Sequence, residues 1–230
     1  MDLLQLREAE ILNTIERLAE FKFVLIGGYA VNTYVLPRFS VDCDIVTEGK
    51  AETTEISRVL QELGYSKEEA PRSNTDLNFA RYEKSLDNGY DVSVDLLIGE
   101  VTDRQTGASF SAGWVFQNSR IRQLRSKTIA KRLRVRIIDL DALVVMKMIS
   151  CRETDVRDVF MLAPQITNVS WVREEISSRC DIMGRYNKLK DKILSKDFRN
   201  GLQGVYGLVD DVAFEKSMKA INSLAPPSSP

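Results

Sequence analysis

The stretch Phe23–Val46, FVLIGGYAVNTYVLPRFSVDCDIV, decides the fold. It begins with an apolar run of strand length, turns at Gly27-Gly28, continues with helical spacing, and ends in alternating apolar and acidic residues. Alternation with a period of two is typical of a strand, so Asp42 and Asp44 should point to one face. The stretch therefore predicts strand, tight turn, helix and strand, with two carboxylates side by side.

A later strand, Tyr90–Ile98, repeats the alternation and carries Asp95 on its polar face. Apolar neighbours predict that Asp95 is buried, and a buried carboxylate needs a partner. A divalent cation shared with Asp42 and Asp44 would meet that need. Taken alone, an acidic pair on a strand is more often a solvated face, so the pattern leaves both interpretations open.

The chain of 230 residues contains no histidine. This excludes imidazole general bases, Ser-His-Asp and Cys-His triads, and zinc sites that need imidazole. Any metal chemistry must then use carboxylate oxygens, which suit Mg²⁺ or Mn²⁺. Three widely spaced cysteines without a CxxC motif predict a reduced, cytoplasmic protein, with Cys43 packed in the core. The acid-rich N-terminus and the lack of an 18-residue apolar run predict no signal peptide and no membrane association.

The glycine pair Gly27-Gly28 lies between an apolar strand and a helix. Glycine lets the backbone approach a ligand closely, and a helix N-terminus offers free N–H groups to a phosphate. A tight structural turn explains the pair equally well. Neither the Walker loop G-x-x-x-x-G-K-[ST] nor the fingerprint G-x-G-x-x-G is present in the chain.

Along the chain, the character changes from mixed to helical near residue 139. An α/β (α+β) lobe is expected over 1–138, a helical lobe over 139–224, and a disordered tail over 225–230. The first lobe should hold a β-hairpin around Asp87-Asn88-Gly89 and a loop or irregular strand over 104–118. Its other expected elements are helices at 2–20, 29–36 and 52–63, and strands at 23–26, 41–46, 77–82, 90–98 and 133–138.

The order of these residues resembles the DNA polymerase β-like nucleotidyltransferase superfamily. Its motif is an apolar residue, a glycine pair, about a dozen residues, D-x-[D/E] and a later carboxylate on a strand. More closely, GGYAVNTYVLPRFSVDCDIV resembles the AbiEii toxin family, with Arg38, Ser40, Asp42 and Asp44 at the positions of R-x-[S/T]-x-D-x-D. The resemblance covers roughly residues 22–163.

A second block, DLDALVVMKMISCRETDVRDVFML (residues 139–162), resembles that family's C-terminal motif. The matching residues are Lys147 and the pair Arg157-Asp158. The family often has a further Asp three residues on, where this chain has Met161. From sequence alone, Lys147 could equally be a surface lysine, and Asp158 could form a surface ion pair.

The resemblance implies a two-lobed enzyme, a nucleotidyltransferase fold with a mixed sheet. Its site would use Mg²⁺ (or Mn²⁺) held by Asp42, Asp44 and Asp95, the carboxylates of the catalytic centre, together with catalytic Lys147 and Asp158. The residues expected to bind the nucleoside triphosphate are Gly27, Gly28, Ser40, Arg38 and Lys147. Relatives are toxins of toxin–antitoxin systems, and some add nucleotides to tRNA ends.

The predicted function is therefore transfer of a nucleoside monophosphate from an NTP to an acceptor hydroxyl, with RNA or tRNA as acceptor and an antitoxin protein as a partner. Two alternatives stay open: a small-molecule nucleotidyltransferase of the antibiotic-modifying type, and a nucleotide-binding protein without catalysis.

A basic segment favours RNA, because residues 105–138 contain no Asp or Glu while the whole chain has a net charge of −1. Trp114 and Phe116 nearby could stack on bases. A basic surface that pairs with acidic parts of the protein is the other interpretation. The positive residues are Arg120, Arg122, Arg125, Lys127, Lys131, Arg132, Arg134 and Arg136.

Overall fold

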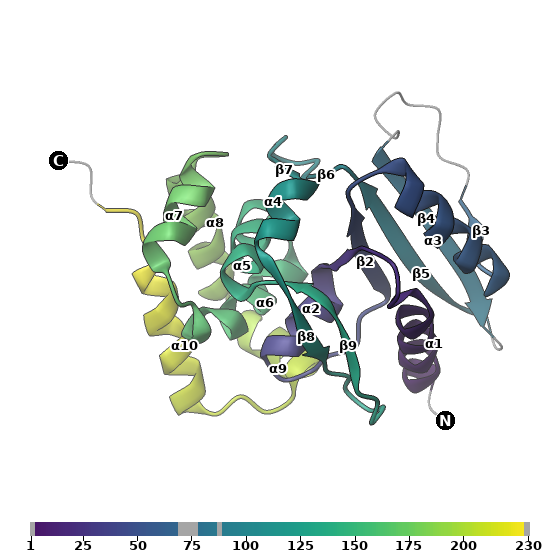
Figure 1. Cartoon of the computed structure of the whole chain (residues 1–230). Helices are drawn as coiled ribbons and strands as arrows, with labels where there is room; N and C mark the ends of the chain where they lie inside the picture. Colours follow the sequence, from purple (N-terminus) through teal and green to yellow (C-terminus); the bar gives the residue numbers. More distant parts are fainter. Residues whose placement is uncertain (1–2, 69–77, 87–88, 228–230) are drawn as a thin grey trace. The chain divides into compact units, whose positions relative to one another are not determined.

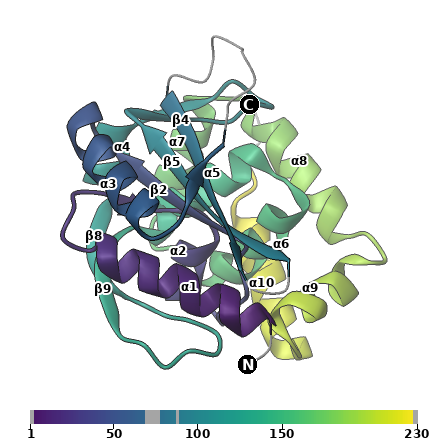
Figure 2. The same ribbon diagram turned by 90° about the vertical axis from the view of Figure 1, so that its right-hand side faces the viewer.

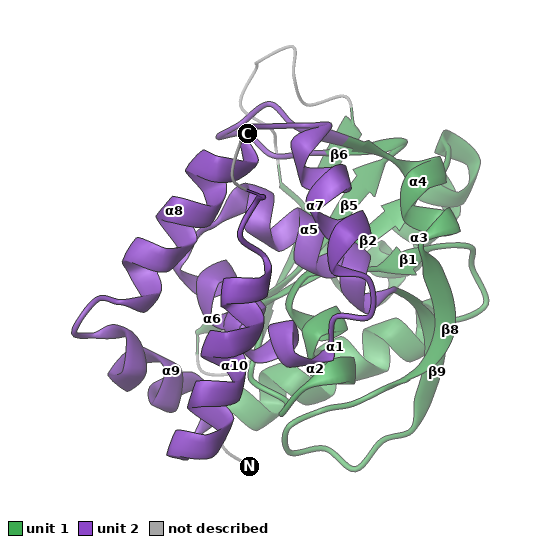
Figure 3. Ribbon diagram, turned by 90° about the vertical axis from the view of Figure 1, so that its left-hand side faces the viewer, with its two compact units in different colours: residues 1–101, 110–138 green, residues 102–109, 139–230 purple. Residues whose placement is uncertain are grey.

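The computed structural model describes residues 3–68, 78–86 and 89–227. The chain forms two compact units, which Figure 3 colours separately. Unit 1 comprises residues 1–101 and 110–138, and unit 2 comprises residues 102–109 and 139–230. Residues 102–109, which the sequence analysis assigned to the first lobe, thus belong to the second unit.

Unit 1 is built on a mixed seven-stranded sheet with the order β3-β4-β5-β2-β1-β9-β8 (Figure 1). β2 runs parallel to β5 and β1 parallel to β9, and the other neighbours are antiparallel. The α/β prediction with a mixed sheet is therefore confirmed. The strands are β1 (Val24–Leu25), β2 (Asp42–Thr47), β3 (Ser66–Lys67), β4 (Phe79–Leu86), β5 (Tyr90–Ile98), β8 (Ser119–Leu124) and β9 (Leu133–Ile138).

Two helices, α1 (Leu3–Leu18) and α3 (Lys50–Glu62), cover one face of this sheet (Figure 2). Glu10 of α1 pairs with Lys84 of β4 at 2.8 Å, and Lys84 lies opposite Val92 of β5. The face that carries Val92 is therefore the core face. Because side chains alternate along a strand, Asp42, Asp44 and Asp95 point to the opposite face. The other helices of the unit are α2 (Gly27–Tyr34) and α4 (Ala112–Gln117).

Unit 2 is helical beyond residue 139, as predicted. Its first helix is buried on nearly every side, which explains its almost uninterrupted apolar sequence. The carboxylate of Asp141 on that helix accepts hydrogen bonds from the backbone of Thr167 and Asn168, which orders the start of the third helix. The helices are α5 (Leu140–Ser150), α6 (Glu153–Leu162), α7 (Val169–Ser177), α8 (Ile182–Ile193), α9 (Phe198–Tyr206) and α10 (Asp211–Ser223), with a 3₁₀ turn at Ala163–Gln165.

The expectation of a loop or irregular strand over residues 104–118 is wrong for residues 112–117, which form a helix. The segment holds β7 (Ser109–Ser111), which pairs with β6 (Glu100–Thr102), and then α4. The serine and threonine residues serve as caps and turn residues rather than as loop filler: Ser111 Oγ accepts from the N–H of Trp114 at 3.1 Å and caps α4.

The hairpin of β4 and β5 is confirmed by their antiparallel register. Of its predicted turn, Asp87 and Asn88 lie outside the described residues, as do residues 228–230 of the predicted tail. Within the part of the chain that the structure describes, no helix combines the length and the apolar character needed to cross a bilayer.

Candidate active site

The three predicted aspartates lie on two neighbouring parallel strands of unit 1. The register sets Asp44 of β2 opposite Asp95 of β5, and Asp42 opposite Ser93. Asp95 is buried, as predicted, whereas Asp42 and Asp44 are half-buried. The sheet therefore brings the three residues onto one face in adjacent rows, with solvent access at Asp42.

A fourth charged residue, Arg81 of β4, extends the row, because it lies opposite Asp95 in the antiparallel register. Its Nε donates to Oδ1 of Asp95 at 2.8 Å and its Nη2 donates to Oδ2 at 2.9 Å. The same Nη2 lies 3.5 Å from Oδ1 of Asp42. These hydrogen bonds to Asp95 raise the pKa of Arg81 further above its usual value, so the guanidinium keeps its charge.

Arg81 and Ser93 are site residues that the sequence analysis missed. Ser93 Oγ donates to Oδ1 of Asp42 at 2.5 Å and fixes that carboxylate from the neighbouring strand. The alternation of β5 pointed to Ser93, since it shares the face of Asp95. A signal for Arg81 lay in the hairpin predicted around Asp87-Asn88-Gly89, because pairing about that turn sets Arg81 opposite Asp95.

The glycine pair is packed against the acidic strand more closely than a side chain would allow. Gly27 has φ +65°, and a Cβ there would lie 1.9 Å from Oδ2 of Asp44. A Cβ at Gly28 would lie 2.3 Å from Oγ of Ser40. Glycine is required at both positions, since only its absent side chain leaves room for the carboxylate and the hydroxyl.

The glycine pair also starts helix α2, whose N-cap is Ile26. An apolar N-cap cannot accept hydrogen bonds from the first amides of the helix, as a Ser or Asp would. The backbone N–H of Ile26 donates to the carbonyl of Asp44 at 3.0 Å, which holds the helix start beside β2. The arrangement leaves a helix N-terminus suited to an anion next to an acidic pair.

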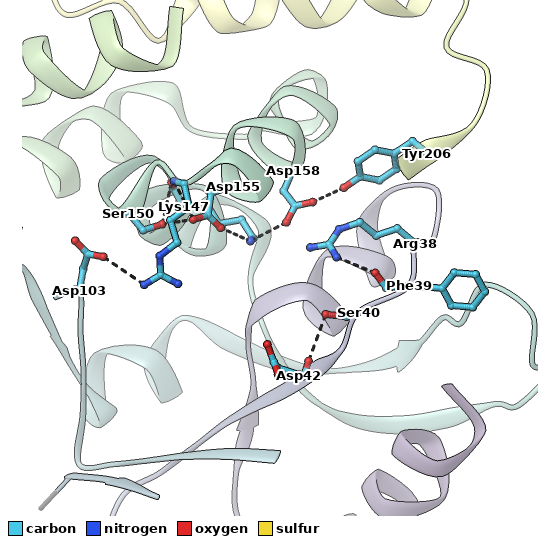
Figure 4. A network of polar contacts seen from close by, with 11 residues as sticks. Arg38, Phe39, Ser40, Asp42, Asp103, Lys147, Ser150, Asp155, Asp158 and Tyr206 are labelled. Carbon is cyan, nitrogen blue, oxygen red and sulfur yellow. Dashed lines mark hydrogen bonds and ion pairs between the residues drawn. The ribbon is translucent and has the colours of Figure 1, made fainter. Parts of the chain in front are cut away.

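The loop that leads into β2 carries the two remaining predicted nucleotide contacts, Arg38 and Ser40. Its anchor is the fully buried Asn32, whose side chain bonds both backbone groups of Arg38, at 2.8 and 3.0 Å. Ser40 Oγ donates to the carbonyl of Asp42 at 3.3 Å, and Arg38 Nη1 donates to the carbonyl of Phe39 at 3.1 Å (Figure 4). The structure thus gathers both residues next to Gly28 and Asp42.

Cys43 lies between the two aspartates of β2 but points to the core and is 1% exposed, which confirms its prediction as a packing residue. Burial, together with the negative charges of Asp44, Asp95 and Asp42, raises the pKa of its thiol well above the usual value. A thiol with a raised pKa is a poor nucleophile, so Cys43 contributes no chemistry.

The predicted residues of unit 2 form a separate buried ion cluster. Lys147 of α5 lies 2.8 Å from Oδ1 of Asp155 and 2.8 Å from Oδ2 of Asp158, both on α6 (Figure 4). Tyr206 at the end of α9 donates to the other oxygen of Asp158 at 2.5 Å. Ser150 Oγ donates to Asp155 at 2.6 Å. The structure therefore brings Lys147 and Asp158 together and excludes a solvent-exposed lysine.

Asp155 is the cluster member that the sequence analysis overlooked. The family motif has its further Asp three residues after Asp158, where this chain has Met161. In this chain the second carboxylate instead comes three residues before Asp158, on the same side of the helix. Burial alone would raise the pKa of Asp155, but the charge of Lys147 and the hydrogen bonds from Lys147 and Ser150 hold it below the usual value. Asp155 is therefore ionised and paired.

The basic segment is the β8–β9 hairpin at the edge of the sheet of unit 1. Part of its charge has partners: Lys131 pairs with Glu16 of α1 at 2.6 Å, and Arg122 lies over the ring of Tyr34. The hairpin loop is anchored to buried Glu8, which accepts from the backbone of residues 127 and 128. The exposed members are Arg120, Arg125, Lys127, Arg132 and Arg134.

The aromatic residues proposed to stack on bases are half-buried in or near α4. Trp114 packs against Phe110 with ring centroids 4.8 Å apart, and Lys22 lies over the ring of Phe116. Both rings therefore already have neighbours in the protein.

The side chains of Asp42, Asp44 and Asp95 form an acidic row. A divalent metal at this row is supported by donor chemistry but not by a cluster already arranged to hold an ion. Asp42 and Asp44 offer hard oxygens on a partly solvated face, which suits Mg²⁺ or Mn²⁺. Among residues 3–68, 78–86 and 89–227, no group of three or more Cys, Asp or Glu side chains is arranged to hold an ion. At this site both oxygens of Asp95 accept hydrogen bonds from Arg81. The pair Asp42/Asp44 fits a metal, and Asp95 fits one only after Arg81 has moved.

No protein-family model and no curated protein matches this sequence. Solved structures do match. A candidate nucleotidyltransferase from Helicobacter pylori aligns with a TM-score of 0.53 at 17% identity, over 97% of this chain and 94% of that one. JHP933 from Helicobacter pylori aligns with a TM-score of 0.46 at 16% identity, over 97% and 91%. An antigenic nucleotidyltransferase-like protein from Paracoccidioides brasiliensis gives 0.46 at 12% identity, over 93% and 96%.

Of these three alignments, only the first exceeds a TM-score of 0.5. It covers nearly the whole of both chains, so the likeness concerns both units and not the sheet alone. The chain has the nucleotidyltransferase fold. At 17% identity the likeness concerns fold only, and the activity has to be argued from the residues of the site.

Proposed function

We propose that this protein is a metal-dependent nucleotidyltransferase that transfers a nucleoside monophosphate from an NTP to an acceptor hydroxyl and releases pyrophosphate. The observation that carries the proposal is the approach of Gly27 to Asp44, where a Cβ would lie 1.9 Å from the carboxylate. A helix N-terminus for phosphate and a carboxylate for a cation are thereby held against each other. A nucleoside triphosphate with its metal is a ligand that needs both.

In this reaction Asp42 and Asp44 would hold Mg²⁺ or Mn²⁺, which would offset charge on the phosphates. The first amides of α2 at Gly27 and Gly28 would bind the triphosphate, with Ser40 and Arg38 beside them. Ser93 keeps the Asp42 carboxylate in place through its 2.5 Å hydrogen bond. Asp95 would accept the proton of the acceptor hydroxyl once its oxygens are released from Arg81. Roles for Lys147 and Asp158 in catalysis stay predictions.

The proposal is tested with the full chain, each labelled NTP, Mg²⁺ or Mn²⁺, and total RNA. Asp44→Ala should abolish incorporation of label, because it removes one of the two carboxylates proposed to bind the metal. The matched control is Asp91→Ala, an exposed aspartate on the same face of β5. Activity at the wild-type level in a folded Asp44→Ala variant would falsify the proposal.

We further propose RNA as the acceptor, supported by the exposed arginines of the β8–β9 hairpin. Reversing the charges of Arg125, Arg132 and Arg134 to Glu should weaken labelling of RNA. A small-molecule acceptor would be labelled as before. The control reverses three exposed lysines of unit 2, Lys196, Lys216 and Lys219, which changes the net charge equally. Equal losses in both variants would count against a specific RNA surface.

The finer assignment, an AbiEii-type toxin with an antitoxin partner, rests on the resemblance of the Arg38–Asp44 and Lys147–Asp158 segments. Expression of the wild-type chain should then arrest growth of a bacterial host, and the Asp44→Ala variant should not. Arrest by both variants would separate toxicity from nucleotidyl transfer and remove this assignment.

A further inference from the structure

Arg81 gives the acidic row a cation of the protein's own. Three aspartates and one arginine leave the row with a formal charge of −2, spread over strands β4, β5 and β2. Both guanidinium bonds to Asp95 have ordinary hydrogen-bond lengths and form the bidentate arrangement that is strongest for Arg and carboxylate. The third contact, 3.5 Å to Asp42, links the same guanidinium to the proposed metal pair.

The burial of Asp95 explains why a cation is needed when no metal is bound. A carboxylate on a residue that is only 7% exposed is costly when it has no partner, and a neighbouring carboxylate in register adds repulsion. Arg81 removes both costs. A divalent ion on the same oxygens would do the same, but it would then stand next to the guanidinium, and two cations at that distance repel each other.

We propose that Arg81 is a positioning residue that competes with the divalent cation for the carboxylates of Asp95 and Asp42. A divalent cation can bind the carboxylate of Asp95 only after the two hydrogen bonds from Arg81 to that carboxylate have broken. The inference rests on the proposed function, because it concerns the metal of that site. It adds a residue, and an order of events, that the three-aspartate motif does not contain.

The exposures of the two partners say which of them moves. The side chain of Asp95 is 10% exposed and is held in the middle of the sheet, between β4 and β2. The side chain of Arg81 is 31% exposed, and it is long and flexible. Arg81 can therefore turn toward solvent while Asp95 stays in place.

Competition is measured directly as binding of Mn²⁺, without NTP, by calorimetry on the full chain. Arg81→Met keeps most of the length and removes the charge. It should bind Mn²⁺ about tenfold more tightly than wild type, the low end of what one neighbouring like charge does to an ionic equilibrium. It should also melt at a lower temperature than wild type in EDTA and recover with Mn²⁺.

The matched control is Arg58→Met, which removes an arginine from two carboxylates, Glu55 and Glu62, on helix α3 of the same unit. It should leave Mn²⁺ affinity unchanged. Equal affinities of wild type and Arg81→Met would overturn the inference, and so would tighter binding in Arg58→Met of the same size.

A second measurement needs no variant at Arg81. The Nε–H of Arg81, bonded to Asp95 at 2.8 Å, should give a protected NMR signal in the metal-free wild type. Saturating Mg²⁺ should shift or remove this signal. A signal that does not change at saturation contradicts the competition, even if Arg81→Met fails to fold.

The two proposals can fail separately. Tighter Mn²⁺ binding by Arg81→Met in a protein that transfers no nucleotide would support the competition and reject the proposed function. The opposite result is a wild type that transfers nucleotides and has the same Mn²⁺ affinity as Arg81→Met. That result would support the proposed function and reject the competition.

Discussion

Each unit holds acidic side chains beside a basic side chain, Arg81 in unit 1 and Lys147 in unit 2, and the two groups differ in solvent exposure. In unit 2, the side chains of Lys147, Asp155 and Asp158 are 9%, 10% and 1% exposed. In unit 1, Asp42 is 45% and Arg81 is 31% exposed. The first group is closed and each of its carboxylates has hydrogen bonds, whereas the second is partly open to solvent. A closed ion cluster can orient helices, while an open one can bind a ligand.

If the closed cluster supports the helices, removing its cation should have the largest effect on stability. Lys147→Met leaves Asp155 and Asp158 buried without their counter-ion, and the free energy of unfolding should fall by about 3–5 kcal/mol. Urea unfolding followed by circular dichroism measures it. The exposed Lys216→Met on α10 is the control and should unfold near the wild-type midpoint. Equal midpoints for wild type and Lys147→Met would contradict a structural role.

If the open cluster serves ligand binding, damage to its geometry should appear mainly in activity. Gly27→Ala pushes a methyl group against Asp44 and strains a backbone with φ +65°, so nucleotide incorporation should fall about a hundredfold. The control, Gly204→Ala in helix α9, adds the same methyl group where nothing lies within 4 Å. Undiminished incorporation by Gly27→Ala would remove the close approach as the basis of the site.

A pH series distinguishes the closed cluster further. The pKa of Asp155 is lower in the folded than in the unfolded chain, so its stabilising contribution is complete above pH 4 and is lost as the pH falls through the folded value. Asp155→Asn should therefore lower the free energy of unfolding by about 2 kcal/mol at neutral pH. The difference should shrink in acid. A difference that does not depend on pH would mean that charge is not the cause.

The smallest effect on the free energy of unfolding is expected at Tyr206, at the edge of the cluster of Lys147, Asp155 and Asp158. Tyr206→Phe removes one hydrogen bond to buried Asp158, whose loss should cost about 1.5 kcal/mol because the acceptor is charged. Tyr90→Phe, at an exposed position on β5, is the control. Unfolding of the two variants at the same denaturant concentration would show that the stability of the fold does not depend on the bond from Tyr206 to Asp158.

The two clusters were unequally visible in the sequence. The turn at Gly27 and the alternation around Asp42 are local patterns, so strand, turn and helix could be predicted together with the side on which the carboxylates lie. Lys147 and Asp158 were found through a family motif. The register of β4 against β5, which sets Arg81 opposite Asp95, follows from the length of the hairpin turn and could have been derived from the predicted turn.

Strand β8 was missed because its residues, SRIRQL, show no alternation of apolar and polar side chains. The sequence therefore lacks the period of two that indicates a strand. Asp155 was missed for a different reason. Its partner, Lys147, lies on another helix, α5, and comes to within 2.8 Å of it only in the folded protein. The periodicity of a single helix or strand can be predicted from the sequence. The contacts between side chains on different helices depend on how those helices pack.

The discontinuous course of unit 2 has a consequence for synthesis. Residues 102–109 belong to that unit, where Asp103 faces Arg152 at 3.7 Å and Gln105 accepts from Lys188 at 3.5 Å. During translation they precede residue 139 by about 30 residues, or roughly 2–6 s at ordinary elongation rates. They wait for their partners while the last strands of unit 1 are made. Dividing the gene at one point therefore cannot yield two self-sufficient halves. A chain truncated after residue 138 would keep Asp103 but would lack the helices of unit 2 against which Asp103 packs.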